Sequence, residues 1–437
     1  MVENQKVCII GIWHLGAVYS ACLADMGYQI TGVDKDVNRV QHLNHGEPPI
    51  FEQGLKELVS KNIAAGRLSY NTDLEQALKG TKYILITFDT PVDDNDEVDL
   101  STIMDTCSEI AGYLANDSIV IISSQVPVGT CDRIRQLINE KNPSLEFDIA
   151  YSPENLRLGQ AIDCFKRPER IVIGANSNAT LERVEALFSI VKVPIIRMNL
   201  RSAEMTKHAL NAFLATTISF ANEIANLCDE VGADALKVTE ALKSESRIGS
   251  KLPLLPGLAF AGGTLARDLK ILQKLGQSSG YETPLINGVL TVNRRQNSLV
   301  IRKLQKIYGS VKDLNIGVLG LTYKPGTSTL RRSAAIEIIK ELTDNGARVK
   351  AFDPKAALEE VQQHREFIFL TDPYAVAQGA DALVIITDWQ EFKYLDFNVI
   401  KNSMKNPVLI DAKNMLDSQL LINGGFLYSG TGRGNKL

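Results

Sequence analysis

Short apolar runs alternate with longer helical segments along the chain, and this alternation limits the possible folds more than any other feature. The first half contains VCIIGI, YQITGVD, YILITF, SIVIISS and RIVIGA, and a second series contains NIGVLGLTY, RVKAFD, ALVIITD and PVLIDA. Apolar strands separated by helices are typical of a parallel sheet that is covered on both faces. The sequence therefore predicts an α/β chain with two doubly wound domains.

Residues 203–233, between the two series, contain no proline and no glycine before Gly232, which predicts one long helix. Its apolar face has three-, four- and seven-residue spacings and consists of Ala209, Phe213, Phe220, Ile224 and Leu227. Lys207 and Asn211 project from another face, one turn apart. Surplus apolar surface on a connecting helix favours a homodimer. We expect two Rossmann-like domains joined by a long central helix, with boundaries at 1–198, 199–300 and 301–437.

Length and composition exclude several classes of protein. A chain of 437 residues has room for two or three domains, each with its own core. No apolar run approaches the roughly 20 residues that span a bilayer, and a formal charge of -4 gives no sign of a nucleic-acid partner. The six cysteines form no C-x-x-C pair, and residues 1–6 lead directly into a strand, so we expect free thiols in a cytoplasmic protein.

Residues 6–36, KVCIIGIWHLGAVYSACLADMGYQITGVDKD, contain most of a dinucleotide-binding fingerprint. Gly11 permits the tight turn, and Gly16 permits close packing of helix and strand. Trp13 stands where the middle glycine lets the pyrophosphate approach. Asp34 follows the second strand, where a carboxylate receives ribose hydroxyls and repels a 2′-phosphate, which favours NAD over NADP. Taken alone, the two glycines are equally compatible with an ordinary α/β turn that binds no cofactor.

Several segments in a specific order resemble the UDP-glucose/GDP-mannose dehydrogenase family over nearly the whole chain. They are FDTPVDDNDEVDLS, VPVGT, SPENLRLG, RPERIVIG, EMTKHALNAFLATTISFANEI, ESRIGSK, PGLAFAGGTLARD, GLTYKPGTSTLRRS and TDWQEF. The resemblance implies an N-terminal NAD domain, a central dimerising helix and a C-terminal domain that binds a nucleotide sugar.

Family enzymes typically oxidise a sugar C6 alcohol twice, through a cysteine thiohemiacetal and a thioester. The run AFAGGTLARD places Thr264 at that cysteine's position. A threonine hydroxyl is far less acidic than a thiol and needs a dedicated base in order to attack. Gln125, Leu158 and Trp13 also depart from the family pattern around the expected meeting point of cofactor and substrate. The resemblance therefore implies that thioester-mediated double oxidation fails here.

The resemblance also assigns site residues. Those expected to be catalytic or to stand at a catalytic position are Glu154, Lys207, Asn211, Thr264 and Asp268. Those expected near the cofactor are Gly11, Trp13, His14, Leu15, Gly16, Asp34, Arg39, Thr90, Pro91, Gln125, Arg267 and Arg331. Those expected to contact substrate are Glu154, Asn155, Leu156, Lys207, Asn211, Arg247, Phe260, Gly262, Lys324 and Lys413. Arg247 matches a residue that reaches a neighbouring subunit's substrate.

Each assigned residue also has a plainer interpretation. Lysine and asparagine on a helix are more often solvated than catalytic, and Asp268 suits the first turn of a helix. Cys164 is interpreted as a buried thiol. The acidic residues 93–99 lack the glycine and spacing of a calcium loop, so we expect a solvated loop and no metal site. The tail GTGRGNKL is expected to be flexible.

Three functions remain open at this point. The first is a nucleotide-sugar oxidoreductase that performs a single oxidation, or that retains NAD and returns the hydride in a redox-neutral epimerisation. The second is a catalytically weak nucleotide-sugar-binding scaffold or sensor. The third is C6 double oxidation without a covalent intermediate. Retention of Lys207, Asn211 and Asp268 favours an enzyme of sugar or polysaccharide metabolism.

Overall fold

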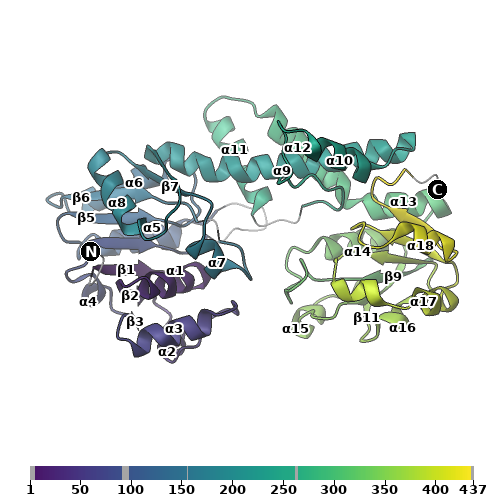
Figure 1. Ribbon diagram of the computed structural model, residues 1–437, viewed down its shortest axis with the longest axis horizontal. Helices are drawn as coiled ribbons and strands as arrows, with labels where there is room; N and C mark the ends of the chain where they lie inside the picture. The colour runs from purple at the N-terminus through teal and green to yellow at the C-terminus, as the bar shows by residue number, and fades with distance from the viewer. Residues whose placement is uncertain (1–4, 91–97, 155, 261–263, 435–437) are drawn as a thin grey trace. The chain divides into compact units, whose positions relative to one another are not determined.

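The computed structural model describes residues 5–90, 98–154, 156–260 and 264–434. The chain forms two compact units, Met1–Ala209 and Leu210–Leu437. Each unit contains a sheet flanked by helices (Figure 1). No helix in the described ranges is both long enough and apolar enough to cross a membrane.

The first unit is built on an eight-stranded sheet with the order β3-β2-β1-β4-β5-β6-β7-β8. Its strands are β1 (Lys6–Ile10), β2 (Gln29–Val33), β3 (Leu68–Asn71), β4 (Tyr83–Ile86), β5 (Ser118–Ile122), β6 (Phe147–Tyr151), β7 (Ile171–Ala175) and β8 (Ile195–Met198). The predicted parallel pairing is confirmed for β1 to β6. The run RIVIGA departs from it, because β7 pairs antiparallel with β6. A parallel pair would need a crossover connection between the two strands, whereas an antiparallel pair does not.

Helices cover both faces of this sheet, as the uninterrupted apolar strands predict. Alternate residues of β1 point to opposite faces, so Val7 and Ile9 belong to one core and Cys8 and Ile10 to the other. The first core is completed mainly by α1 (His14–Asp25), α2 (Val37–Asn44), α3 (Leu55–Ala64), α7 (Ala161–Lys166) and α8 (Asn178–Phe188). The second is completed by α4 (Leu74–Leu78), α5 (Ser101–Ile110) and α6 (Thr130–Lys141).

The second unit contains a six-stranded, fully parallel sheet with the order β11-β10-β9-β12-β13-β14. Its strands are β9 (Asn315–Leu319), β10 (Arg348–Phe352), β11 (Ile368–Phe369), β12 (Ala382–Ile385), β13 (Val408–Asp411) and β14 (Leu427–Gly430). One face packs against α13 (Leu299–Tyr308), α14 (Ala334–Asp344) and α15 (Leu358–Val361). The other packs against α16 (Pro373–Ala377), the 3-10 helix η1 (Gln390–Tyr394), α17 (Phe397–Ser403) and α18 (Ser418–Asn423).

The predicted central helix is confirmed as α9 (Leu200–Val231), which begins in the first unit and continues into the second. In the second unit it packs with α10 (Ala235–Ser244), α11 (Leu265–Ser278) and α12 (Pro284–Asn297). The architecture is therefore two Rossmann-like domains joined by one long helix.

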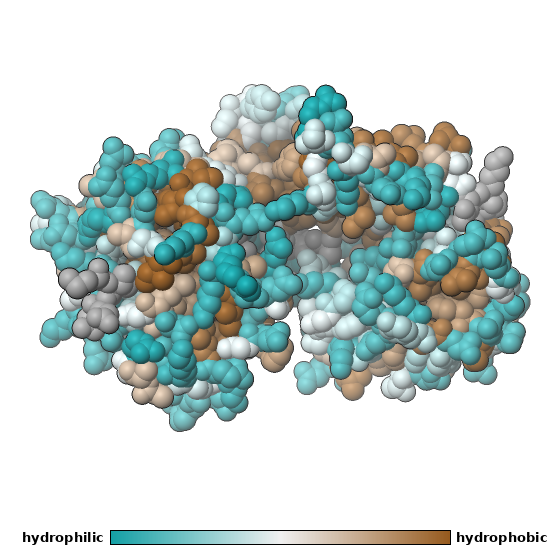
Figure 2. Space-filling view, in the orientation of Figure 1, coloured by the Kyte–Doolittle hydropathy of each residue, from teal (hydrophilic) through white to brown (hydrophobic). Residues whose placement is uncertain are grey.

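The apolar face of α9 is exposed, whereas much of its polar face is buried. Phe213, Phe220 and Leu227 are 54%, 47% and 56% exposed. Most of the buried polar residues recur at helical spacing, and they are Glu204, Lys207, His208, Asn211, Thr217, Ser219 and Asn222. Figure 2 shows hydrophobic residues at the surface of the region that contains α9, α10, α11 and α12. The helix is thus held to its own chain by polar contacts and leaves an apolar stripe uncovered.

Candidate active site

The turn after β1 has the close packing that a dinucleotide fingerprint requires. Gly11 has φ +92°, and a Cβ there would lie 2.7 Å from the Phe88 ring. A Cβ on Gly16 would lie 2.1 Å from the Gly11 carbonyl oxygen and 2.7 Å from the Thr87 hydroxyl. Any side chain at either position would force the strand, turn and helix apart. Both glycines are therefore needed for the tight junction between β1 and α1.

Helix α1 begins immediately after Trp13, which makes no side-chain capping bond and is 40% exposed. Within the described part of the chain, no acceptor receives the backbone N–H groups of His14, Leu15 and Gly16. A helix N-terminus with unsatisfied donors and a positive dipole end favours a phosphate. These amides fit the pyrophosphate of NAD, although the indole occupies the position of the middle glycine.

Asp34 links the turn to the end of β2. Its carboxylate is 7% exposed and accepts the backbone N–H of Ile12 at 3.1 Å and of Asp36 at 3.0 Å. It also pairs with Arg39 Nη1 at 2.7 Å. A carboxylate offers about four acceptor positions, so one remains for a ribose hydroxyl. The arrangement fits an NAD ribose.

Arg39 connects Asp34 to Trp13. Its guanidinium carbon lies 5.0 Å from the centre of the indole ring, within cation–π range. Its buried Nε atom has no hydrogen-bond partner among the described residues, which leaves a donor for a ligand. A cavity of about 360 Å³ adjoins this cluster and is lined by Trp13, Asp36, Asn38, Arg39, His42, Glu47, Pro48 and Pro49.

Glu52 is a candidate positioning residue that sequence reasoning missed. Its side chain is 1% exposed and lies 3.2 Å from His14 Nε2, at the first residue of α1. The same carboxylate accepts the N–H groups of Gly159 and Ala161 at 2.9 and 2.8 Å. It therefore joins the α1 N-terminus to the segment that follows Glu154. No periodic pattern marks Glu52, because it lies in a loop.

Further predicted residues follow the carboxyl ends of β4, β5 and β6, where α/β sheets bind ligands. The Thr90 hydroxyl donates to the Gln125 carbonyl oxygen at 2.9 Å, and both side chains are buried. These two loops therefore lie together beside the Gly11 turn, which Thr87 contacts through its hydroxyl. The predicted residues Pro91 and Asn155 lie outside the described ranges.

Lys207 and Glu154 form a buried pair in the first unit. Lys207 Nζ donates to the Glu154 carbonyl oxygen at 2.6 Å and lies 3.1 Å from its Oε1 atom. The Leu156 N–H donates to the other carboxylate oxygen at 2.8 Å. Lys207 is 7% exposed, so the solvated interpretation does not hold for it. A buried ammonium next to a carboxylate can stabilise a developing alkoxide.

The first turns of α9 hold Lys207 in place through two further buried residues. Glu204 accepts the N–H groups of Gly129 and Cys131, at 2.6 and 2.8 Å, and so caps the N-terminus of α6. His208 Nε2 lies 2.9 Å from the Val126 carbonyl oxygen. The sequence pattern did not single out either residue, although Glu204 lies three residues before Lys207 and four before His208, which is helical spacing.

Asn211 and Asp268 form a second buried pair, which lies in the second unit. Asn211 Nδ2 donates to Asp268 Oδ2, and the two side chains are 6% and 0% exposed. Asp268 lies in the first turn of α11, so its helix-dipole interpretation also holds. Thr264 is the N-cap residue of this helix and is exposed. No described side chain or amide is hydrogen-bonded to its hydroxyl.

The remaining predicted residues lie in the second unit, with varied exposure. Phe260 is 9% exposed and exchanges two backbone hydrogen bonds with the Asn293 side chain. Lys413 lies 3.4 Å from Asp388, and Arg247 pairs with Glu245 on its own loop with a side chain that is 86% exposed. Arg267 and Lys324 are half-buried, and Arg331 is exposed. Gly262 lies outside the described ranges.

Most of the cysteine thiols are buried. Burial raises the pKa of Cys8, Cys22 and Cys107 to about 12 and also raises the pKa of Cys131 and Cys228. Cys164 is partly buried on α7. A thiol with a raised pKa is seldom a thiolate and is a poor nucleophile at neutral pH. The five buried cysteines are therefore unsuited to act as catalytic nucleophiles.

Comparison with known proteins assigns the family. Profiles for three domains of one family match the chain in order: the NAD binding domain at residues 5–192, the central domain at 201–295 and the UDP binding domain at 317–418. The chain belongs to the UDP-glucose/GDP-mannose dehydrogenase family. It is an NAD-dependent oxidoreductase whose substrate class is a nucleotide sugar.

Relatives in this dehydrogenase family match over nearly their full length. UDP-glucose 6-dehydrogenase TuaD of Bacillus subtilis is 37% identical over 98% of this chain and 93% of that protein. A UDP-glucose 6-dehydrogenase of Rhizobium meliloti is 38% identical over 98% of this chain and 100% of its own. The solved structure of a UDP-glucose dehydrogenase from Pyrobaculum islandicum has a TM-score of 0.87 at 28% identity, with 99% and 98% of the two chains covered.

Proposed function

We propose that this dehydrogenase acts on a UDP-sugar without a thioester intermediate. It either oxidises one alcohol once or retains NAD and completes a redox-neutral epimerisation. The observation that carries this proposal is Thr264, an exposed hydroxyl at the N-terminus of α11 with no described base hydrogen-bonded to it. Such a hydroxyl is a weak nucleophile, and the buried cysteines do not replace it.

The retained polar pairs supply what a reaction at one alcohol needs. NAD, when bound, accepts a hydride from the carbon that carries the hydroxyl. Lys207 neutralises the developing charge on that oxygen, and Glu154 holds the ammonium in position. Asn211 and Asp268 orient a water molecule or carry the proton. Neither role requires a covalent bond to the protein.

The cofactor residues of the first unit support a modified NAD site. We assign the pyrophosphate to the α1 N-terminus and the adenosine ribose to Asp34 and Arg39, beside the 360 Å³ cavity. Trp13 forms a wall of that cavity and replaces the open backbone of the middle glycine. Thr90 and Gln125 of this unit, and Arg267 and Arg331 of the second unit, are assigned to the cofactor by family resemblance alone.

The match to the family's UDP binding domain at residues 317–418, together with the UDP-glucose 6-dehydrogenases among the relatives, supports a UDP-sugar over a GDP-sugar. We assign substrate contacts to Leu156, Phe260, Lys324 and Lys413. Lys413 presents a single ammonium where the family usually has arginine, so it loses bidentate recognition of a phosphate. The three-domain division at residues 1–198, 199–300 and 301–437 and a cytoplasmic location belong to the same proposal.

The exposed apolar stripe on α9 supports a homodimer. Phe213, Phe220 and Leu227 are spaced seven residues apart, so they lie along one side of the helix. Exposed apolar residues in one continuous row are typical of a protein–protein interface. Arg247, with a largely exposed side chain, is then available to a second copy of the chain.

The experiment compares Thr264→Cys with the wild type and uses Thr264→Ser as the matched control. We expect wild type and Thr264→Ser to yield an aldehyde or an epimer, with at most one reduced NAD per sugar. We expect Thr264→Cys to form the acid and reduce two NAD per sugar, because a cysteine at a helix N-terminus has a lowered pKa. Product analysis by mass spectrometry and counting of reduced cofactor supply the readout.

The same measurements test the two alternatives. Acid formation by the wild type, with two reduced NAD per sugar, would contradict the proposal in favour of double oxidation without a covalent intermediate. Thermal stabilisation by UDP-sugars without turnover would contradict it in favour of a binding protein. Reduced nicotinamide bound to the protein as purified would support the redox-neutral reaction in particular.

A further inference from the structure

The buried Glu52 carboxylate lies between the helix end assigned to NAD and the segment that follows Glu154. Its side chain is 1% exposed. Its Oε2 atom lies 3.2 Å from His14 Nε2 and accepts the N–H of Gly159 at 2.9 Å, while its Oε1 atom accepts the N–H of Ala161 at 2.8 Å. His14 and Ala161 are the first residues of α1 and α7. One carboxylate therefore contacts the start of both helices.

Glu52 is held in one position by its own loop and by the groups around it. Its carbonyl oxygen accepts the N–H of Leu55 at 3.0 Å, and Leu55 is fully buried in the core that α1 shares. A carboxylate that accepts amides at a helix N-terminus is favoured by the helix dipole. Burial penalises any arrangement in which the carboxylate lacks these donors. The contacts of Glu52 with α1 and α7 are therefore fixed rather than optional.

The segment that Glu52 holds also supports Glu154. Gly159 has φ +85°, and the Gln160 N–H donates to the Arg157 carbonyl oxygen at 2.9 Å, so the chain turns tightly before α7. Leu156 packs against the core that α1 shares, and its N–H donates to Glu154 Oε2 at 2.8 Å. A shift of this turn would therefore move the donor that orients the Glu154 carboxylate.

The other end of the series is His14, whose backbone N–H is one of the amides assigned to the pyrophosphate of NAD. The contacts run from His14 through Glu52 to the turn before α7, and from there to Glu154 and the Lys207 ammonium. All of these residues belong to the first unit. Hydride transfer depends on the relative position of cofactor and alcohol, and a misplacement of about 1 Å can cost roughly a hundredfold in rate.

We propose that Glu52 is a positioning residue for hydride transfer, because it fixes the Glu154 and Lys207 pair relative to the cofactor. This role rests on the proposed function, since it requires NAD at the α1 N-terminus and a sugar alcohol at Lys207. The same contacts link the two ligands. NAD bound at the turn fixes His14 and, through Glu52, lowers the cost of ordering the segment that contacts the sugar.

Steady-state kinetics of Glu52→Gln with NAD and UDP-glucose test this role. Glutamine keeps the size of the side chain but removes its charge and one acceptor oxygen. We expect kcat to fall at least about tenfold while both KM values change less than about threefold, because the ligands still bind but the reacting groups are misplaced.

Asp25→Asn is the matched control for Glu52→Gln. Asp25 also joins α1 to α3 and α7, through Lys61 and Lys166 at 2.7 Å each, but it does so at the C-terminal end of α1. Both variants should lose stability, whereas kcat of Asp25→Asn should stay within about twofold of the wild type. A purely structural role for Glu52 would lower stability in both variants without a fall in kcat.

A double-mutant cycle with His14→Phe tests whether His14 and Glu52 act together. Phenylalanine keeps an aromatic ring and removes both ring nitrogen atoms. The double variant should have a kcat within about twofold of Glu52→Gln alone, because both changes interrupt the same series of contacts. A double variant in which the two single effects multiply would overturn the connection through His14.

Titration calorimetry gives a second test that does not require turnover. NAD should bind the wild type at least about threefold more tightly in saturating UDP-glucose, and Glu52→Gln should lose this effect. Wild-type kcat in Glu52→Gln, or the same effect of UDP-glucose on NAD affinity in both proteins, would overturn the role of Glu52 and leave the proposed reaction intact. Coupled binding without turnover in the wild type would contradict the reaction and support the role of Glu52. A wild type that does not bind NAD would overturn both.

Discussion

Burial changes the interpretation of Lys207 from a solvated residue to a candidate catalytic one. A lysine on a helix is usually solvated, but here its ammonium is buried and bonded to both the carbonyl and the carboxylate of Glu154. An ammonium held in this way stabilises negative charge at a fixed point, because little reorganisation is needed when that charge forms. Asn211, four residues later, is buried against Asp268 in the same manner.

Lys207→Ala should abolish turnover, with a loss of at least about a hundredfold in kcat, because it removes the charge that stabilises the alkoxide. Steady-state kinetics with a UDP-sugar and NAD measure the effect. Lys401→Ala is the control, since Lys401 also bonds a carbonyl oxygen, that of Gly424, but lies outside the site. Turnover of Lys207→Ala at the wild-type rate would remove Lys207 from the catalytic residues.

We expect Asp34, which pairs with Arg39, to select NAD over NADP. Asp34→Ser should weaken NAD binding by roughly tenfold, because a ribose contact is lost. It should also improve NADP binding relative to NAD, because the released Arg39 guanidinium can pair with the 2′-phosphate. Titration of both cofactors by calorimetry measures the ratio. An unchanged NAD-to-NADP ratio would argue against Asp34 as the ribose carboxylate.

In each sheet, a glycine turn after one strand is followed by an N–H that donates to an aspartate. The two aspartates differ in whether an acceptor position remains open. After β1, Gly11 is followed by an Ile12 N–H that donates to Asp34; after β9, Gly320 is followed by a Leu321 N–H that donates to Asp353. The Asp353 Oδ2 atom also accepts from the Thr322 N–H and hydroxyl and from the Trp389 indole. The second carboxylate is thus engaged by its own domain, whereas Asp34 keeps an acceptor position for a ribose.

Ion pairs between helices of the first unit make its stability depend on pH. Asp25, at the end of α1, lies 2.7 Å from both Lys61 on α3 and Lys166 on α7. Burial alone would raise the pKa of Asp25, but hydrogen bonds and charges from Lys166 and Lys61 outweigh burial and hold the pKa below its ordinary value.

A lowered carboxylate pKa in the folded state means that the stabilisation is present above the unfolded pKa of about 4 and is lost as the pH falls through the folded value. The wild type should therefore lose about 1 kcal/mol more stability than Asp25→Asn between neutral and strongly acidic pH. Denaturant unfolding at a series of pH values measures this difference. Parallel pH profiles for the two proteins would contradict a role for Asp25.

At the scale of the whole molecule, α9 joins two domains and exposes an apolar stripe. Phe220→Glu should convert the proposed homodimer to a monomer at micromolar concentration, because it places a charge in the centre of the stripe. Sedimentation velocity measures the change. Tyr394→Glu is the control, since Tyr394 is 85% exposed on η1, outside the stripe. A monomeric wild type would contradict the proposed dimer.

Much of the fold could be predicted because its signals are local. Apolar runs marked nine of the strands, and the absence of proline and glycine marked α9, since both follow from backbone and burial preferences within short segments. The strands β3, β6, β8, β11 and β14 and the reversed direction of β7 were not foreseen, because strand pairing depends on contacts far apart in the chain. The tail was expected to be flexible, but Gly432 and Gly434 are bonded to Asp229 on α9.

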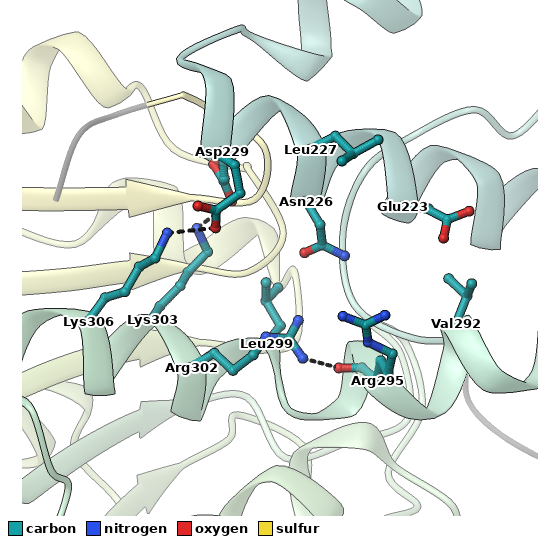
Figure 3. Close-up of a pocket in the computed structure, with 11 residues that line it drawn as sticks. Glu223, Asn226, Leu227, Asp229, Val292, Arg295, Leu299, Arg302, Lys303 and Lys306 are labelled. Atoms are coloured by element: carbon teal, nitrogen blue, oxygen red, sulfur yellow. Dashed lines mark hydrogen bonds and ion pairs between the residues drawn. The ribbon is translucent and has the colours of Figure 1, made fainter.

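By itself the sequence determined two Rossmann-like domains, the long central helix, the preference for NAD and the family, together with the threonine at the expected cysteine position. Only the tertiary structure decided that the polar face of α9 is the buried one and that Glu52 joins the α1 N-terminus to the segment after Glu154. The tertiary structure alone places Arg295 and Arg302 in the lining of one cavity, which is formed by α9, α12 and α13 (Figure 3). The physical reason is the range of the forces involved. Helix and strand preferences act over a few residues, whereas a buried charge requires a partner that the fold brings from elsewhere in the chain.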